Sequence, residues 1–326
     1  TDVDSTLLTS ARVTIGTGYD SSDVLAATLT SGSGLTQSYA NGVLTLSGSA
    51  SLATYQTALR TVSFSNTSDN PSTTPSREIS VVVTDNSSSS TANSSAITRT
   101  VAVVSVNDAP TISYVNATYA NATLPTVTEQ VSSSLAGVGI SIADADAGTN
   151  SLTLTLSVTS GVLSATAGNS GATISGSGSN SLTISGSQSA IGNILAGTGT
   201  GTLSYVNNLD NPAALDRLSL TLNDNGASGL GGALITTAAY EFTVLSVNDR
   251  PVVSLSSSTN AQALYAGSVG TALLSPQGTV TDSDSSSFVS VQVQISTGFM
   301  TGDKLVLTTA ASLTLSSAGF TESYNV

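Results

Sequence analysis

The 326-residue sequence contains no Cys, no His and no Trp, and it has only 7 Lys and Arg residues against 20 Asp and Glu residues. Without Cys, the fold has no disulfides to stabilise it. Without Cys or His, it also lacks the usual nucleophile–base pairs and any imidazole metal site, and no GxSxG or phosphate-loop motif is present. These absences predict that the chain is not an enzyme.

The charge balance is equally selective. A formal net charge of −13 argues against nucleic acid and anionic membrane surfaces, both of which attract Lys and Arg. No apolar run approaches the roughly 18 residues of a membrane span. Only 8% of residues are charged while 39% are hydrophobic, which predicts a folded chain with a surface of Ser, Thr, Asn and Gly. The excess of carboxylates suits a hard cation such as Ca²⁺.

Internal repeats are the strongest signal that is present. Two motifs recur with one common spacing of 141 residues: VNDAP at 106–110 with VNDRP at 247–251, and FSN–DNP at 64–71 with YVN–DNP at 205–212. The opening TDVD at 1–4 matches TDSD at 281–284. We therefore expect a window from a longer array, with a truncated repeat at 1–107, a complete repeat at 108–248 and a truncated repeat at 249–326.

The local pattern within the repeats predicts strands. Apolar and polar residues alternate at 79–83, 152–158, 218–222 and 289–295, which is typical of half-buried strands. Turn residues separate them, as at 40–42 and 223–226. The segments 51–59 and 189–195 break the alternation and predict short helices, the first with Ser51 as its cap. The fold class is therefore all-β, with tandem antiparallel sandwiches.

Five aromatic residues lie among the alternating apolar positions, and we expect them to pack in the core or at sheet edges. They are Tyr19, Tyr39, Phe64, Tyr205 and Phe299. The Asp-Asn-Pro triplets at 69–71 and 210–212 are interpreted as strand-ending turns, because Pro fixes its own φ and extends the preceding residue.

Taken together, the segment 55–71, the VTD at 83–85 and the VNDAP at 106–110 resemble the cadherin-like tandem repeats of giant bacterial surface adhesins. The resemblance covers the whole chain. It implies cadherin-like or immunoglobulin-like sandwiches arranged as a rod, calcium at the junctions between them, and a place outside the cell.

The resemblance also implies which residues hold calcium, because junctions of this type use a first-strand glutamate, an Asp-x-Asp and an Asn-Asp linker. At the first junction these would be Asn107, Asp108, Glu129, Asp144 and Asp146. Asp85 and Asp224, each at the end of a predicted strand near a linker, are further candidates. The next junction offers Asn248, Asp249, Asp282 and Asp284, and the opening Asp-x-Asp is Asp2 and Asp4. No glutamate occurs near 265–267, where the second junction would need one. The alternative for every Asp-x-Asp is ordinary turn chemistry.

The sequence therefore predicts a non-enzymatic, extracellular stalk that contacts the neighbouring repeats of its own chain. Two alternatives stay open: a subunit of a surface filament, sheath or S-layer that packs laterally on other copies, and a glycan-binding module.

Overall fold

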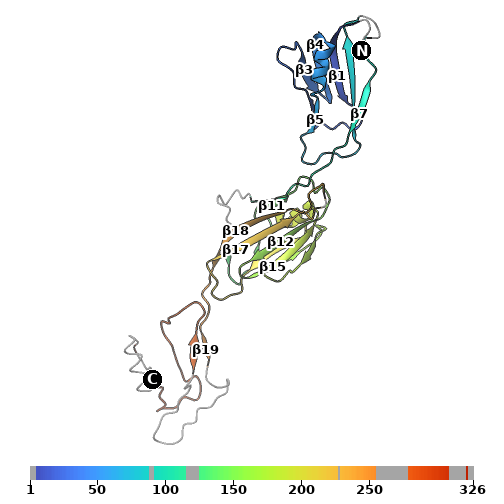
Figure 1. Ribbon diagram of the computed structural model, residues 1–326. Helices are drawn as coiled ribbons and strands as arrows, with labels where there is room; N and C mark the ends of the chain where they lie inside the picture. The colour runs from blue at the N-terminus through green and yellow to red at the C-terminus, as the bar shows by residue number, and fades with distance from the viewer. Residues whose placement is uncertain are drawn as a thin grey trace. The chain divides into compact units, whose positions relative to one another are not determined.

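The computed structural model describes residues 5–87, 92–114, 125–226, 228–254, 278–307 and 321. The chain divides into two compact units, residues 1–247 and 248–326. The first unit contains two hydrophobic cores that have no residue in common. We call the elements around them the first sandwich, blue to cyan in Figure 1, and the second sandwich, green to yellow. Among the described residues, no helix is long and apolar enough to cross a membrane.

The first sandwich packs a five-stranded sheet of order β3-β4-β1-β6-β7 against the pair β2-β5. All of its strand pairs are antiparallel. Its elements are β1 (Leu7–Ile15), β2 (Asp23–Ala26), β3 (Thr36–Ala40), β4 (Val43–Ser51), α1 (Leu52–Leu59), β5 (Ser63–Asn66), β6 (Arg77–Asp85) and β7 (Ile97–Val101).

The second sandwich is built on the same plan, with a sheet of order β14-β15-β12-β17-β18-β9, a second sheet β10-β16-β13 and the pair β11-β8. Among the named strands that the structure describes, only β9 and β18 pair in parallel. Its elements are β8 (Thr111–Tyr114), β9 (Val127–Thr128), β10 (Ser133–Ser134), β11 (Ile140–Ala143), β12 (Leu152–Val158), β13 (Val162–Thr166), β14 (Thr173–Ser175), β15 (Ser181–Gly186), α2 (Gln188–Ala196), β16 (Thr202–Val206), β17 (Leu215–Asn223) and β18 (Ile235–Leu245).

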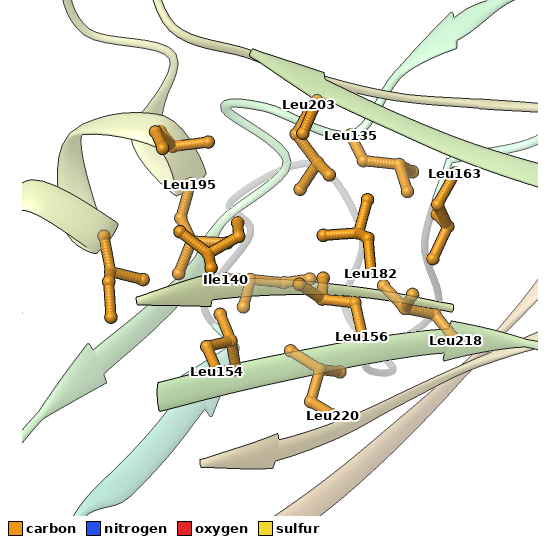
Figure 2. Packing of buried hydrophobic residues seen from close by; sticks show 14 of the residues in the cluster. Leu135, Ile140, Leu154, Leu156, Leu163, Leu182, Leu195, Leu203, Leu218 and Leu220 are labelled. Atoms are coloured by element: carbon orange, nitrogen blue, oxygen red, sulfur yellow. The ribbon is translucent and has the colours of Figure 1, made fainter. Parts of the chain in front are cut away.

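Strict alternation explains why β12 stands at the centre of the second core. Its apolar residues are all buried, and the Ser and Thr residues between them are half-buried. Leu154 and Leu156 belong to one buried cluster with Leu163 and Leu203 from the opposite sheet, and Figure 2 draws this cluster. Each leucine buried in this way stabilises the fold by about 1.5–3 kcal/mol relative to an exposed one. The predicted strands at 79–83, 152–158 and 218–222 and the all-β fold class are thus confirmed.

Both predicted helices are also confirmed, and both begin in the same way. Ser51 Oγ accepts the backbone N–H of Thr54 at 3.2 Å, and Ser187 Oγ accepts that of Ala190 at 3.2 Å. These side chains satisfy one of the N–H groups that the first turn of a helix leaves free. The helix α2 ends at Gly197 in the left-handed region, whereas α1 ends at Arg60 in a helical conformation.

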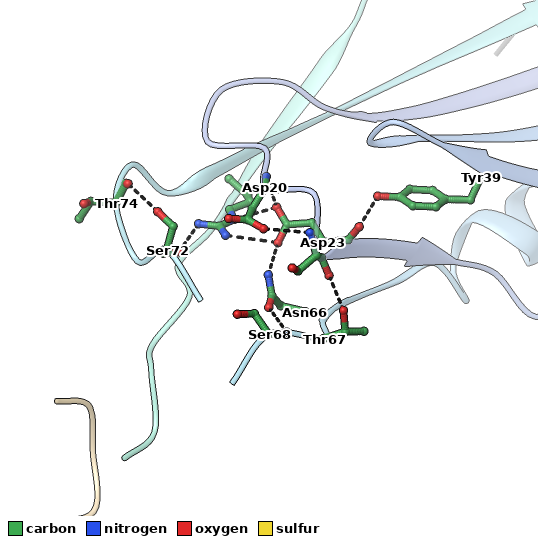
Figure 3. Close-up of polar contacts among 10 residues, drawn as sticks. Asp20, Asp23, Tyr39, Asn66, Thr67, Ser68, Ser72 and Thr74 are labelled. Atoms are coloured by element: carbon green, nitrogen blue, oxygen red, sulfur yellow. Dashed lines mark hydrogen bonds and ion pairs between the residues drawn. The ribbon is translucent and has the colours of Figure 1, made fainter. Parts of the chain in front are cut away.

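A buried ion pair lies at the end of the first sandwich where β2 and β6 begin, as drawn in Figure 3. Arg77 Nε donates to Asp23 Oδ2 at 3.0 Å, and neither side chain is exposed. Asn66 Nδ2 donates to the other carboxylate oxygen at 2.7 Å. Burial raises the pKa of Asp23, but the hydrogen bonds from Arg77 and Asn66 outweigh it and hold the pKa below its ordinary value.

The second unit contains the antiparallel pair of β19 (Val252–Ser254) and β20 (Thr279–Thr281). The strand predicted at 289–295 is wrong, since the structure has no strand there and Val289, Val291 and Val293 are exposed. The shift of 280 residues that matches 1–4 with 281–284 places this segment on 9–15, which lies in β1. The strands β4 and β6 flank β1, whereas no described strand flanks 289–295. Alternation alone cannot form a strand without neighbours that satisfy its backbone groups.

The prediction for the aromatic residues is confirmed for some and wrong for others. Tyr205 is buried in the second core, and Tyr39 and Phe64 pack against the first. Tyr19 is 39% exposed and Phe299 is 50% exposed. Tyr19 follows the end of β1, where the chain has left the sheet, and it is therefore not covered by the opposite layer.

Candidate functional site

The Asp-x-Asp of the second sandwich follows directly on the end of β11 and forms a tight turn. Asp144 Oδ1 accepts the backbone N–H groups of Asp146 at 3.2 Å and Ala147 at 2.9 Å. The backbone N–H of Asp144 donates to Gln188 Oε1 at 2.8 Å, which ties the turn to the first residue of α2. The turn is thus held from both sides.

The linker before β8 touches this turn. The backbone N–H of Asp108 donates to Asp146 Oδ2 at 3.1 Å. Asp146 is buried at 4% exposure, whereas the Asp108 side chain is exposed. The structure therefore brings together Asp108, Asp144 and Asp146, three of the residues that the sequence places at the first junction.

Two carboxylate oxygens of the turn are buried and have no hydrogen-bond partner: Asp144 Oδ2 and Asp146 Oδ1. Burial raises the pKa of Asp144, and the adjacent Asp146 side chain raises it further, although backbone N–H groups oppose both. A buried carboxylate without a partner is costly, so this turn lacks positive charge. Hard cations that take oxygen ligands fit such a donor set.

The second unit repeats this arrangement. Asp282 Oδ1 accepts the backbone N–H groups of Asp284 at 3.2 Å and Ser285 at 2.9 Å. The backbone N–H of Asp249 donates to Asp284 Oδ2 at 2.9 Å. Asp284 Oδ1 is again buried without a partner. Two backbone bonds to the first Asp, one linker bond to the second Asp and one unpartnered oxygen on the second Asp are thus found in both units. The third Asp-x-Asp, Asp2 and Asp4, lies outside the described residues, as does the segment 265–267.

Asn107 and Asp224 also meet, but their polar groups bond to each other. Asn107 Nδ2 donates to Asp224 Oδ2 at 2.5 Å, and Asp224 Oδ1 accepts the backbone N–H groups of Gly226 and Leu234, each at 2.8 Å. Burial raises the pKa of Asp224, but these hydrogen bonds outweigh it and lower the pKa overall. Asn248 is exposed and donates to the backbone oxygen of Asp249.

The grouping of Glu129 with Asp144 and Asp146 is wrong. Glu129 follows β9, which pairs with the last residues of β18, and its Oε1 accepts the backbone N–H of Val247 at 2.5 Å. Asp224 lies beside the first residue of β18. Asp224 bonds to Asn107, and the next residue, Asp108, touches Asp146, so the Asp-x-Asp lies at the end of the sandwich where β18 begins. Glu129 lies where β18 ends, and the 11 residues of β18 span about 33 Å at the usual rise per residue. Glu129 Oε2 is buried without a partner at the end where the chain leaves the second sandwich.

The prediction that Asp85 lies near the first linker is also wrong, because Asp85 is at the opposite end of β6 from the point where the chain leaves the sandwich. It ends β6 beside Leu8, and its Oδ1 accepts the backbone N–H of Ser87 at 2.6 Å. β7 leads back to the opposite end of β6, where Val101 pairs with Arg77. Asp85 thus lies at the end of β6, as Asp224 lies at the end of β17 in the second sandwich, and it is beside the start of β1.

The described residues contain no group of three or more acidic, His or Cys side chains arranged around one point. Each candidate site is a carboxylate pair with a linker residue beside it, which is fewer than the 6–8 oxygens that calcium takes. Sequence reasoning missed two supports of this arrangement, namely Gln188 and the loop around Gly229. The run of glycines at 226–232 was the available signal for the second.

No protein-family model matches the chain. No curated protein sequence matches it either. Among solved structures, the chain is similar to the protocadherin gammaB7 EC3-6 cis-dimer, with 16% identity and a TM-score of 0.29 over 82% of this chain and 50% of that one. It is also similar to human CDH23 EC21-23, with 14% identity and a TM-score of 0.29 over 84% of this chain and 69% of that one.

A further similarity is to an endo-fucoidan hydrolase of glycoside hydrolase family 107, with 16% identity and a TM-score of 0.19 over 70% of this chain and 26% of that one. The chain spans about half the length of the protocadherin gammaB7 chain that it matches. The antiparallel strand pairs of the two sandwiches define the fold class.

Proposed function

We propose that the chain is a non-enzymatic structural segment of an extracellular surface protein, a stalk of cadherin-like repeats at 1–107, 108–248 and 249–326 whose junctions bind calcium. The observation that carries the proposal is the pair of buried, unpartnered oxygens of Asp144 and Asp146. An evolved fold that keeps such atoms needs a reason for them, and a bound cation supplies one.

The second unit supports the same conclusion, because Asp249, Asp282 and Asp284 repeat the arrangement with another orphaned oxygen. Parts that recur once per repeat suit a structural role better than an active site. The complete absence of His and Cys points the same way. Calcium bound here would neutralise each carboxylate pair, and the exposed Asp108 side chain and the half-buried Asp249 side chain offer further oxygens beside it.

The expected affinity is compatible with a place outside the cell. Extracellular modules bind calcium with a Kd of about 10⁻⁴–10⁻³ M. Free calcium at about 100 times Kd would stabilise the folded state by about 2.7 kcal/mol per site. The cation would then contribute a large part of the net stability of a single domain, which is about 5–15 kcal/mol.

The test is thermal unfolding of the full chain in calcium and in chelator, with the Asp144→Asn variant. Asparagine keeps the Oδ1 acceptor of the turn while it removes the charge, so the turn stays formed. We expect the variant to unfold at a higher temperature than the natural chain in chelator and to lose the calcium-dependent rise that Asp144 carries. Asp210→Asn is the matched control, because Asp210 is exposed and bonds only to Gln130 among the described residues. A natural chain that unfolds at the same temperature with calcium and with chelator would refute the proposal.

A further inference from the structure

The linker residues before the second sandwich lie along the β17–β18 loop. Val106 and Leu230 form an isolated parallel bridge. The backbone N–H of Leu230 donates to Ser105 O at 3.0 Å, and that of Asn107 donates to Leu230 O at 2.8 Å. Thr236 Oγ1 adds a bond to Pro110 O at 2.5 Å. The linker therefore pairs with this loop at an isolated bridge before β8 begins.

The side chain of Asn107 is the centre of this contact, and it is only 5% exposed. Its Nδ2 donates to Asp224 Oδ2 at 2.5 Å and to Gly232 O at 3.0 Å, and its Oδ1 accepts Ser228 Oγ at 3.2 Å. Both amide protons and the oxygen are thus engaged by the loop. Because a buried amide is costly without partners, this set of bonds favours one position of the linker.

Gly229 makes the close approach of the loop possible. Its φ is +76°, and an added Cβ would lie 2.7 Å from both Asn107 N and Val106 C. Gly232 is the natural comparison, because its φ is +71° but an added Cβ would meet nothing within 4 Å. Both glycines adopt a conformation that side chains disfavour, but only Gly229 is in steric contact with the linker.

The motif alone does not produce this contact. Asn248 occupies the same place in the second VND, yet it is exposed and its amide reaches only the adjacent Asp249 O among the described residues. The loop from Asp224 to Thr236, and not the Asn-Asp pair, therefore distinguishes the first linker from the second.

We propose that this loop is a clamp that locks linker residues 105–110 onto the second sandwich in the absence of any cation. Asn107 is its positioning residue, since it sets the backbone that presents Asp108 to Asp146. Bending between the first and second sandwiches then occurs upstream of Ser105, and the VNDAP motif is a rigid part of the second sandwich. The proposal stands on contacts within the protein and is independent of calcium binding.

Hydrogen exchange of the full chain in chelator tests this, read in peptides that cover 105–108 and 228–232. We expect these amides to be protected in the natural chain and in Gly232→Ala. In Gly229→Ala they should exchange at least about 10-fold faster, because the added methyl group forces the linker away from the loop and the amides are then exposed by local opening alone. Rapid exchange in the natural chain in chelator, or equal exchange in the two alanine variants, would overturn the proposal.

The amides of β12 show whether the second sandwich remains folded in each variant. If Gly229→Ala also loosens β12, Asn107→Ala decides the question, with Asn248→Ala as its control. The clamp requires the Asn107 variant to lose protection at 105–108 and the Asn248 variant to keep it. Retained protection in Asn107→Ala would contradict the proposal.

Discussion

The first and second sandwiches bury an acidic residue at the same end of the fold, but they satisfy it by different means. In the first, Asp23 pairs with the guanidinium of Arg77. In the second, Asp216 is 4% exposed and forms no ion pair with any described residue. It accepts hydrogen bonds from Tyr205 Oη at 2.7 Å and from the backbone N–H of Thr159 at 3.0 Å. In the second sandwich, neutral hydrogen-bond donors therefore take the place that the Arg77 guanidinium has in the first, although the strand arrangement is the same.

An asparagine at the end of the neighbouring strand is common to both solutions. Asn66 Oδ1 accepts the backbone N–H of Ser68 at 2.8 Å, and Asn207 Oδ1 accepts that of Leu209 at 3.0 Å. The amide of Asn66 then reaches Asp23, whereas that of Asn207 reaches Ser160 Oγ, itself a donor to Asp216. The turn is retained while its buried partner changes, so the scaffold does not dictate the chemistry of its polar cluster.

The largest expected effect is that of Arg77→Met. It leaves the Asp23 carboxylate buried without its cation, and loss of one partner of a buried pair costs about 3–5 kcal/mol. Unfolding of the first sandwich, followed by hydrogen exchange of β1, measures this cost, and exchange of β12 should not change. The exposed Arg217 provides the control, since Arg217→Met should cost no more than about 1 kcal/mol. A loss below about 1 kcal/mol for Arg77→Met would show that Asn66 and the local backbone suffice for Asp23.

The second prediction concerns alkaline pH and Tyr205. Burial and the hydrogen bond to Asp216 raise the pKa of this phenol to about 12. A raised pKa favours the protonated form in the folded state, so this contribution to stability is complete below pH 10 and is lost as the pH rises to about 12. The loss corresponds to about 2.7 kcal/mol, at 1.36 kcal/mol per pH unit.

Tyr205→Phe keeps the edge-on contact with Phe242 while it removes the titrating hydroxyl. The variant should be less stable than the natural chain by about 1–3 kcal/mol at neutral pH, because Asp216 loses a donor. Between pH 10 and 12, however, its second sandwich should lose less stability than that of the natural chain, as measured by denaturant unfolding at each pH. Parallel pH profiles for the two proteins would mean that Tyr205 does not titrate in this way.

Neither polar cluster could be predicted from the sequence, whereas the strands around them could. The alternation at 152–158 specifies β12 locally, because a period of two defines a face. Asp23 and Arg77 lie 54 residues apart, and no local pattern links them. The segment 289–295 shows the limit of alternation, since that pattern carries no information about whether neighbouring strands exist.

The candidate calcium sites likewise contain residues whose positions the sequence could predict and residues whose positions it could not. The pairing of Asp144 with Asp146 follows from their spacing, and the recurring VND motif indicated that a linker would lie close by. Glu129 and Asp85 were misplaced because a motif gives no direction along a strand, and the two ends of a nine-residue strand such as β6 lie about 27 Å apart. The clamp depends on a glycine whose role is visible only when the linker is seated against it.

The smallest expected effect compares the two helices. The caps Ser51 and Ser187 make the same 3.2 Å bond, so Ser51→Ala and Ser187→Ala should each cost about 1 kcal/mol. The helices differ in what they bury, Tyr55 and Ala58 in α1 against Ile191, Ile194 and Leu195 among the buried residues of α2. Equal losses, measured by denaturant unfolding, would show that capping acts locally in both sandwiches. Ser189→Ala is the control, because Ser189 Oγ touches only Ser187 Oγ among the described groups and should cost much less. A loss in α2 that exceeds the loss in α1 by 1 kcal/mol or more would mean that the cap of α2 also fixes the packing of its apolar face, because fraying of the first turn would loosen the buried Ala190 and Ile191.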